Sequence, residues 1–328
     1  MPVYSVKGGH AVKKVTVRMI GAAVGVSHST VSRVLNNDPR VHPETRDLVL
    51  KTMRQMDYRI ETGNGRRTVA LILGNNRMTG YVSSVLEKLL FALRQRGMRA
   101  ELVNSGDVEL LGSRAIVGAI ALALEAELNE RWSELQNLPL VRLNSPGCHR
   151  DTIYSVRSDG DAGMKLAVNF LLRHGHRRIA FLSDEEYRHE PELFSGRFHG
   201  FCEAMRAAGE REPERFSFFR DYPAPGFRNL LDLGVTAAIC VGELHGAIVA
   251  RKIHEEGLRV PEEFSLLSLE MPRISENLTP PHTTLSQDFE ALAEQAVCLL
   301  EALIDHRAAS DVSIPYRLIE RRSVSFMH

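Results

Sequence analysis

The chain has 328 residues, of which 44% are hydrophobic and 25% are charged. It can therefore bury a sizeable core, which excludes a disordered or fibrous protein. The formal net charge is zero, but residues 1–60 hold ten Lys and Arg against four Asp and Glu, a net of +6. A basic end on an acidic remainder favours a polyanionic partner for that end alone.

Cysteine spacing and hydropathy further narrow the class of protein. The four cysteines are far apart in the sequence and form no Cys-x-x-Cys pair, which disfavours a zinc site and indicates a reducing compartment. No stretch reaches about 18 uninterrupted apolar residues, so we expect no membrane span. Residues 1–14 lack the apolar segment of a signal peptide and are interpreted as a flexible basic tail. We expect a cytoplasmic protein without cofactor or metal.

Residues 15–58 have the pattern of a small helical domain. Thr16 can cap a first helix whose apolar residues recur at helical spacing. Gly25 can end that helix in the left-handed conformation, and Ser27 can cap a second helix. Pro43 suits the first turn of a third helix. Two short helices around a glycine-containing turn predict a helix-turn-helix domain.

The second of these helices is the predicted DNA-reading element, because its N-terminal side chains would enter the major groove. Arg33 can bind guanine through two hydrogen bonds, and His28 and Ser29 are short enough to read base edges. Contacts to phosphate set the register without reading the sequence. We expect these contacts from Thr16, Ser27, Thr30, Asn36 and Arg40.

A predicted linker at residues 59–68 separates this domain from residues 69–328, where short apolar runs alternate with amphipathic stretches. That alternation predicts parallel α/β sheets, and its length suits two doubly wound lobes with ligand space between them. The predicted strands are 69–73, 100–103, 117–123, 140–143, 178–182, 237–241 and 264–269. The predicted helices are 81–96, 160–173, 197–208, 243–256 and 288–305.

The sequence VSHSTVSRVLNNDPRV at residues 26–41 closely resembles the head of LacI/GalR-family repressors. The resemblance continues through HGHRRIAFLS (174–183), SGRFHGFCEAMRAAG (195–209) and TPPHTTLSQDFEALAEQAVCLLEAL (279–303). It implies a helix-turn-helix head joined to two parallel-sheet lobes of periplasmic-binding-protein type. It also implies a homodimeric repressor that binds a pseudo-palindromic operator on double-stranded DNA.

The resemblance further implies a sugar-like effector between the lobes. The family's pocket positions fall on Asp159, Arg197, Tyr222, Glu243 and Glu270. Asp159 can instead serve as the cap of the helix that starts at residue 160, and Arg197 can instead form an ion pair between the lobes. The chain has Gly242-Glu243 and Glu270-Met271 where the family has Asn-Asp and Asp-Asp, so the effector of a relative cannot be assumed.

Two segments are shorter than their family counterparts. The linker lacks the sequence of the family's hinge helix, which inserts a leucine into the minor groove. The segment between residues 105 and 116 is also short, so we expect one helix of the first lobe to be reduced. These departures leave open an alternative, in which the sensor domain has lost its ligand and serves for dimerisation. An enzyme is disfavoured, because the sequence has no nucleophile elbow, phosphate loop or metal-spaced cluster.

Overall fold

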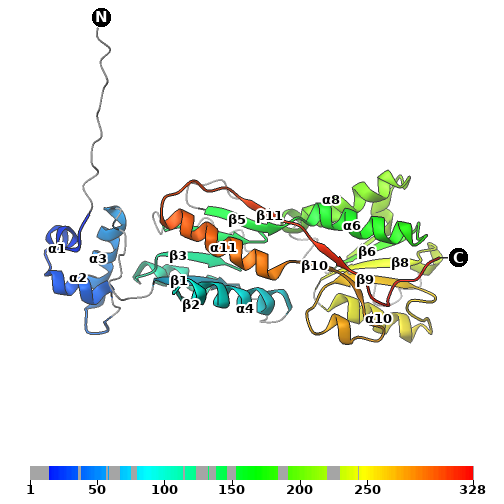
Figure 1. Ribbon diagram of the computed structural model, residues 1–328, viewed down its shortest axis with the longest axis horizontal. Helices are drawn as coiled ribbons and strands as arrows, with labels where there is room; N and C mark the ends of the chain where they lie inside the picture. The colour runs from blue at the N-terminus through cyan, green and yellow to red at the C-terminus, as the bar shows by residue number, and fades with distance from the viewer. Residues whose placement is uncertain are drawn as a thin grey trace, which may run out of the picture.

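The computed structural model describes residues 15–35, 38–56, 58, 67–74, 80–113, 115–122, 132, 138–145, 153–183, 191–219, 230–242 and 244–327. A helical head at one end is followed by two α/β lobes (Figure 1). The predicted fold class is confirmed. Within the described residues, no helix has the length and apolar character needed to cross a membrane. The predicted tail, 1–14, and residues 59–66 of the predicted linker lie outside the described residues.

The head contains three helices, α1 (Val17–Val24), α2 (His28–Leu35) and α3 (Pro43–Gln55). Thr16 caps α1, since its Oγ1 accepts a hydrogen bond from the backbone N–H of Met19 at 3.3 Å. Gly25 ends the helix with φ at +75°, and the Oγ of Ser27 accepts a hydrogen bond from the N–H of Thr30 at 3.1 Å. The buried hydrophobic side chains of the head are those of Ile20, Val31, Val34, Val49, Leu50 and Met53, joined by Ala115 of the first lobe.

The first lobe is built on a sheet in the order β11–β5–β4–β3–β1–β2, with all neighbours parallel. Its strands are β1 (Thr68–Leu73), β2 (Arg99–Asn104), β3 (Gly118–Ala121), β4 (Leu140–Leu143), β5 (Ile153–Ser158) and β11 (Val312–Ile314). One face packs against α4 (Gly80–Gln95) and α11 (Phe289–Ile304). On the other face lies η1 (Ser105–Ser113), a 3-10 helix in the segment where a reduced helix was expected.

The second lobe has a sheet in the order β12–β10–β9–β8–β6–β7. Its strands are β6 (Ile179–Ser183), β7 (Ser217–Phe219), β8 (Ala237–Val241), β9 (Ser265–Leu269), β10 (Thr283–Ser286) and β12 (Arg317–Ile319). The edge strand β12 is antiparallel to β10, and the other pairs are parallel. The helices α6 (Gly160–Arg173) and α8 (Pro191–Ala207) cover one face, and α10 (His245–Glu255) covers the other (Figure 1). Two short 3-10 helices, η3 (Pro213–Phe216) and η4 (Ser275–Asn277), lie in the connections.

The chain passes between the lobes three times, from β5 to α6, from β10 to α11 and from β11 to β12. The three crossings are tied together by side chains. The Oε1 of Gln287 accepts hydrogen bonds from the Nδ2 of Asn144 at 2.6 Å and from the Oγ of Ser158 at 2.9 Å. Arg317 forms an ion pair with Asp288 at 2.6 Å. This network defines the boundary at which a ligand could contact both lobes.

Candidate functional site

The exposed face of α2 carries the predicted base-reading residues. His28, Ser29 and Arg33 are exposed, while Val31 and Val34 of the same helix are fully buried in the head core. Helical spacing explains this division, since residues three apart share a face and the intervening ones point elsewhere. The structure therefore leaves the three side chains free to meet a DNA groove. Their contacts with bases remain a prediction.

Hydroxyl groups gather at the N-terminus of α2. The Oγ of Ser27 lies 2.8 Å from the Oγ of Ser29 and 2.9 Å from the Oγ1 of Thr30. The first N–H groups of a helix also point out at this end and favour an anion. The arrangement suits a DNA phosphate, which is the predicted role of Ser27 and Thr30. Asn36, predicted to contact phosphate as well, lies outside the described residues.

Arg40, another predicted phosphate ligand, is paired within the head. Its Nε and Nη2 donate to the two carboxylate oxygens of Asp38 at 3.0 and 2.7 Å. The Arg40 guanidinium holds the pKa of Asp38 well below its ordinary value. Because this carboxylate balances the charge of Arg40, we expect a smaller contribution of Arg40 to DNA affinity than from an unpaired arginine.

Gly21, which was not predicted as a site residue, sets the contact between α1 and the turn that precedes α2. A Cβ at this position would lie 2.8 Å from the backbone oxygen of Val26, a distance that real Cβ atoms essentially never show. Glycine inside a helix costs about 1 kcal/mol relative to alanine. Its presence in mid-helix was a signal that the backbone of another segment approaches closely.

At the boundary between the lobes, Arg197 of α8 reaches the third crossing. Its Nε and Nη2 donate to the hydroxyl of Tyr316 at 3.2 and 2.9 Å. Asp159 lies at the first crossing and caps α6, because its Oδ1 accepts a hydrogen bond from the N–H of Ala162 at 3.0 Å. Asp159 therefore serves as a helix cap, which was the alternative to its predicted ligand contact. Tyr222 and Glu243 lie outside the described residues.

Glycines bring Arg197 and Asp159 together by allowing α6 and α8 to pack closely. A Cβ on Gly160 would lie 2.9 Å from the Cγ of Arg197, and a Cβ on Gly200 would collide with the backbone of Asp161. The two helices can therefore approach at this point only without side chains. The contact between the two helices therefore places the N-terminus of α6 beside Arg197, which donates to Tyr316 at the third crossing.

Three buried hydroxyls near the carboxyl ends of the strands were also missed. The hydroxyls of Ser145 and Ser183 have no hydrogen-bond partner among the described residues, and the buried hydroxyl of Tyr81 lies beside the side chain of Asn144. Burial raises the pKa of Tyr81, and the neighbouring Tyr316 raises it further. A buried polar group without a partner costs about 1–3 kcal/mol, a cost that a bound polar ligand or water can offset. Ligands of open α/β sheets bind at the carboxyl ends of the strands.

The carboxylate of Glu270 is paired and hydrogen-bonded within the second lobe. Its side chain is 7% exposed, and Arg321 donates to its two oxygens at 2.8 and 3.1 Å. The hydroxyl of Thr284 donates to the same carboxylate. Both oxygens therefore have internal partners, and the predicted ligand role of Glu270 has no support from this geometry.

Two family models match the chain. The model for bacterial regulatory proteins of the lacI family matches residues 16–60, which contain the helix-turn-helix, and the model for a periplasmic binding protein-like domain matches residues 168–324. The resemblance of the sequence to LacI-family regulators is confirmed, and with it the function of a DNA-binding transcription regulator.

Relatives of this chain are similar to it along nearly their whole length. The HTH-type transcriptional repressor PurR of Klebsiella pneumoniae subsp. pneumoniae is 26% identical over 336 residues, covering 94% of this chain and 97% of the relative. The HTH-type transcriptional regulator CelR of Thermobifida fusca is 27% identical over 335 residues, covering 94% and 96%. These relatives are named as transcription regulators and not as enzymes.

Solved structures show the same architecture. The complex of transcriptional regulator CelR with cellobiose has a TM-score of 0.69 at 25% identity and covers 94% of this chain and 99% of that one. The Lac repressor dimer bound to operator and the anti-inducer ONPF has a TM-score of 0.65 at 21% identity, with 95% and 100% covered. Because the Lac repressor is only 21% identical to this chain, its similarity supports the fold alone.

Proposed function

We propose that this LacI-family regulator is a repressor that binds a pseudo-palindromic operator with α2 in the major groove. The observation that carries the proposal is the face of α2, on which His28, Ser29 and Arg33 are exposed beside a hydroxyl cluster at the helix N-terminus. Arg33 would bind a guanine, and the cluster would hold a phosphate. Each head would occupy one half-site.

The proposed dimer uses exposed apolar side chains of both lobes. Leu90 and Phe91 of α4 are 43% and 62% exposed, and Leu244 and Ile248 at the start of α10 are 46% and 37% exposed. In Figure 1 the two helices lie along the same long edge of the molecule. Large apolar residues gathered on a surface are typical of protein interfaces. A second copy of the chain, packed on this edge, would cover them and place two heads side by side.

The proposed effector is a small polyhydroxylated molecule bound between the lobes. Arg197 is held at the crossing by Tyr316, and the hydroxyls of Ser145 and Ser183 are buried without partners among the described residues. Such a ligand would satisfy several hydroxyls at once, with aromatic rings at its faces. The CelR structure contains cellobiose, a ligand of this chemical class. Tyr222 and Glu243 remain proposed ligand contacts.

The alternative is a sensor domain that serves only for dimerisation. Two of the pocket positions favour it, since Asp159 caps α6 and Glu270 is paired with Arg321. A thermal-shift screen of sugars, polyols and nucleosides, run with and without operator selected from random DNA, separates the two functions. Stabilisation by one class of compound, with a change in operator affinity, supports an effector. Operator binding that no compound alters supports the alternative.

Arg197→Ala tests the cleft with whichever compound stabilises the wild type. The variant should lose the stabilisation and keep operator affinity without ligand within a few-fold. Arg206→Ala is the matched control, because Arg206 lies on the same helix and pairs with Glu214 away from the crossing. A normal ligand response in Arg197→Ala would remove Arg197 from the site.

A further inference from the structure

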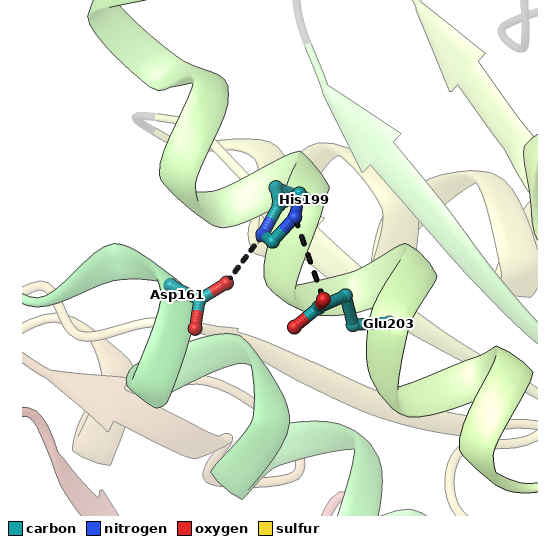
Figure 2. Close-up of side chains that lie close together, drawn as sticks. All are labelled: Asp161, His199 and Glu203. Carbon is teal, nitrogen blue, oxygen red and sulfur yellow. Dashed lines mark hydrogen bonds and ion pairs between the residues drawn. The ribbon is translucent and has the colours of Figure 1, made fainter.

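Three metal-ligating side chains meet on the outer side of the second lobe, outside the crossings and the head (Figure 2). Asp161 comes from the first turn of α6, and His199 and Glu203 come from α8. One ligand atom from each residue lies within 4.8 Å of the ligand atoms of the other two. The side chains of Asp161, Glu203 and His199 are 34%, 46% and 61% exposed, so an ion could enter from solvent.

The backbone holds these donors in place. His199 and Glu203 are four residues apart, so both project from one face of α8. Asp161 is brought opposite them because Gly160 and Gly200 let α6 and α8 pack closely. In Figure 2 the imidazole of His199 lies between the two carboxylates. Its Nδ1 is 2.7 Å from the Oδ1 of Asp161, and its Nε2 is 3.6 Å from the Oε1 of Glu203.

Lys165 organises the carboxylates from the other side. Its Nζ lies 2.6 Å from the Oδ2 of Asp161 and 2.5 Å from the Oε2 of Glu203. Lys165 therefore engages one oxygen of each carboxylate and leaves Oδ1 and Oε1 directed at His199. Lys165 already supplies one positive charge to the pair, so a bound cation would share the two carboxylates with it.

We propose that Asp161, His199 and Glu203 bind a divalent transition-metal ion, with Zn²⁺ as the best match. Imidazole nitrogen and carboxylate oxygen are ordinary zinc ligands, and three protein ligands leave a fourth position for water. Bonds of about 2.1 Å in a tetrahedral site place donors roughly 3.4 Å apart, whereas the ligand atoms here lie within 4.8 Å of one another. Side-chain rotations that turn one imidazole nitrogen toward both carboxylates would bring the three donors onto one ion. Lys165 would remain on the outer oxygens.

The test is calorimetric titration of Zn²⁺ into the full-length protein after removal of any affinity tag and bound metal. The wild type should bind zinc at this site, and His199→Ala should weaken that binding by at least about tenfold. Glu203→Gln keeps the side-chain shape and should weaken it as well. His254→Ala is the matched control, because His254 is also an exposed histidine on a helix, α10. It should bind zinc as the wild type does.

Two further measurements make the outcome decisive. Thermal melts without metal should coincide for wild type and His199→Ala, since the His199 side chain is 61% exposed. Co²⁺ should give the visible absorption of a tetrahedral site in the wild type, and this absorption should be absent from His199→Ala. Equal zinc binding by the two proteins, or no zinc binding by the wild type, would overturn the proposal. Neither result bears on the proposed DNA recognition, whose residues lie in the head.

Discussion

Replacing Gly21 with alanine separates two opposing effects within α1. Helix propensity alone favours alanine by about 1 kcal/mol. The added Cβ, however, would lie 2.8 Å from the backbone oxygen of Val26, which can move only by shifting the turn before α2. Overpacking of this kind costs about 1–3 kcal/mol. We expect the contact to prevail, so that the head loses up to about 2 kcal/mol of stability.

Hydrogen exchange of the amides in α1 and α2, followed by mass spectrometry on the full chain, measures this change locally. A loss of about 2 kcal/mol corresponds to exchange roughly 30-fold faster in Gly21→Ala. The control is Ala22→Gly, at an exposed position of the same helix, which should also accelerate exchange because glycine lowers helix propensity. If helix propensity alone set the exchange rates, Gly21→Ala would slow exchange and Ala22→Gly would speed it. Slower exchange in Gly21→Ala would therefore refute the steric account.

Three further predictions concern single ionisable groups. Burial lowers the pKa of His282 from 6.5 to about 4, so the neutral imidazole stabilises the fold above about pH 6.5. That stability should be lost as pH falls toward 4, by roughly 3 kcal/mol in urea melts, and His282→Leu should remove this part of the pH dependence. Glu270→Gln leaves Arg321 without its carboxylate and should cost about 3 kcal/mol in the same assay; a change below about 1 kcal/mol would mean that the pair contributes little. Asp38→Asn frees the charge of Arg40 and should steepen the salt dependence of DNA binding by about one unit of log–log slope; an unchanged slope would show that Arg40 meets no phosphate.

Elements with a continuous apolar run or a clear amphipathic pattern were predicted closely. Predicted strands 140–143 and 237–241 coincide with β4 and β8, and predicted helix 160–173 coincides with α6. The strands β5, β7, β10, β11 and β12 were not among the strands predicted from apolar runs. The last two are three residues each, and each pairs with a different sheet after the chain crosses between lobes. Such pairing depends on the tertiary arrangement and leaves little periodicity in the sequence.

The residues of the candidate sites also divide into those that a local sequence pattern predicts and those that only the tertiary structure brings together. The exposed face of α2 followed from local helical spacing and from the caps at Thr16 and Ser27. The contacts of Arg197 with Tyr316 and of Glu270 with Arg321 join residues more than fifty positions apart, so no local pattern could reveal them. The same holds for the contact between Asp161 and His199, which are 38 positions apart in the sequence. Glycine-mediated packing of α6 on α8 brings that pair together.

Selection of binding sites from random double-stranded DNA tests the central claim most directly. The wild-type chain should select a pseudo-palindromic sequence. Arg33→Ala should select the same sequence with the preference lost at one symmetric base pair, at a cost of about 1–3 kcal/mol on the wild-type site. A wild-type pool without a common sequence, or an Arg33→Ala pool with every preference unchanged, would contradict recognition of DNA by α2.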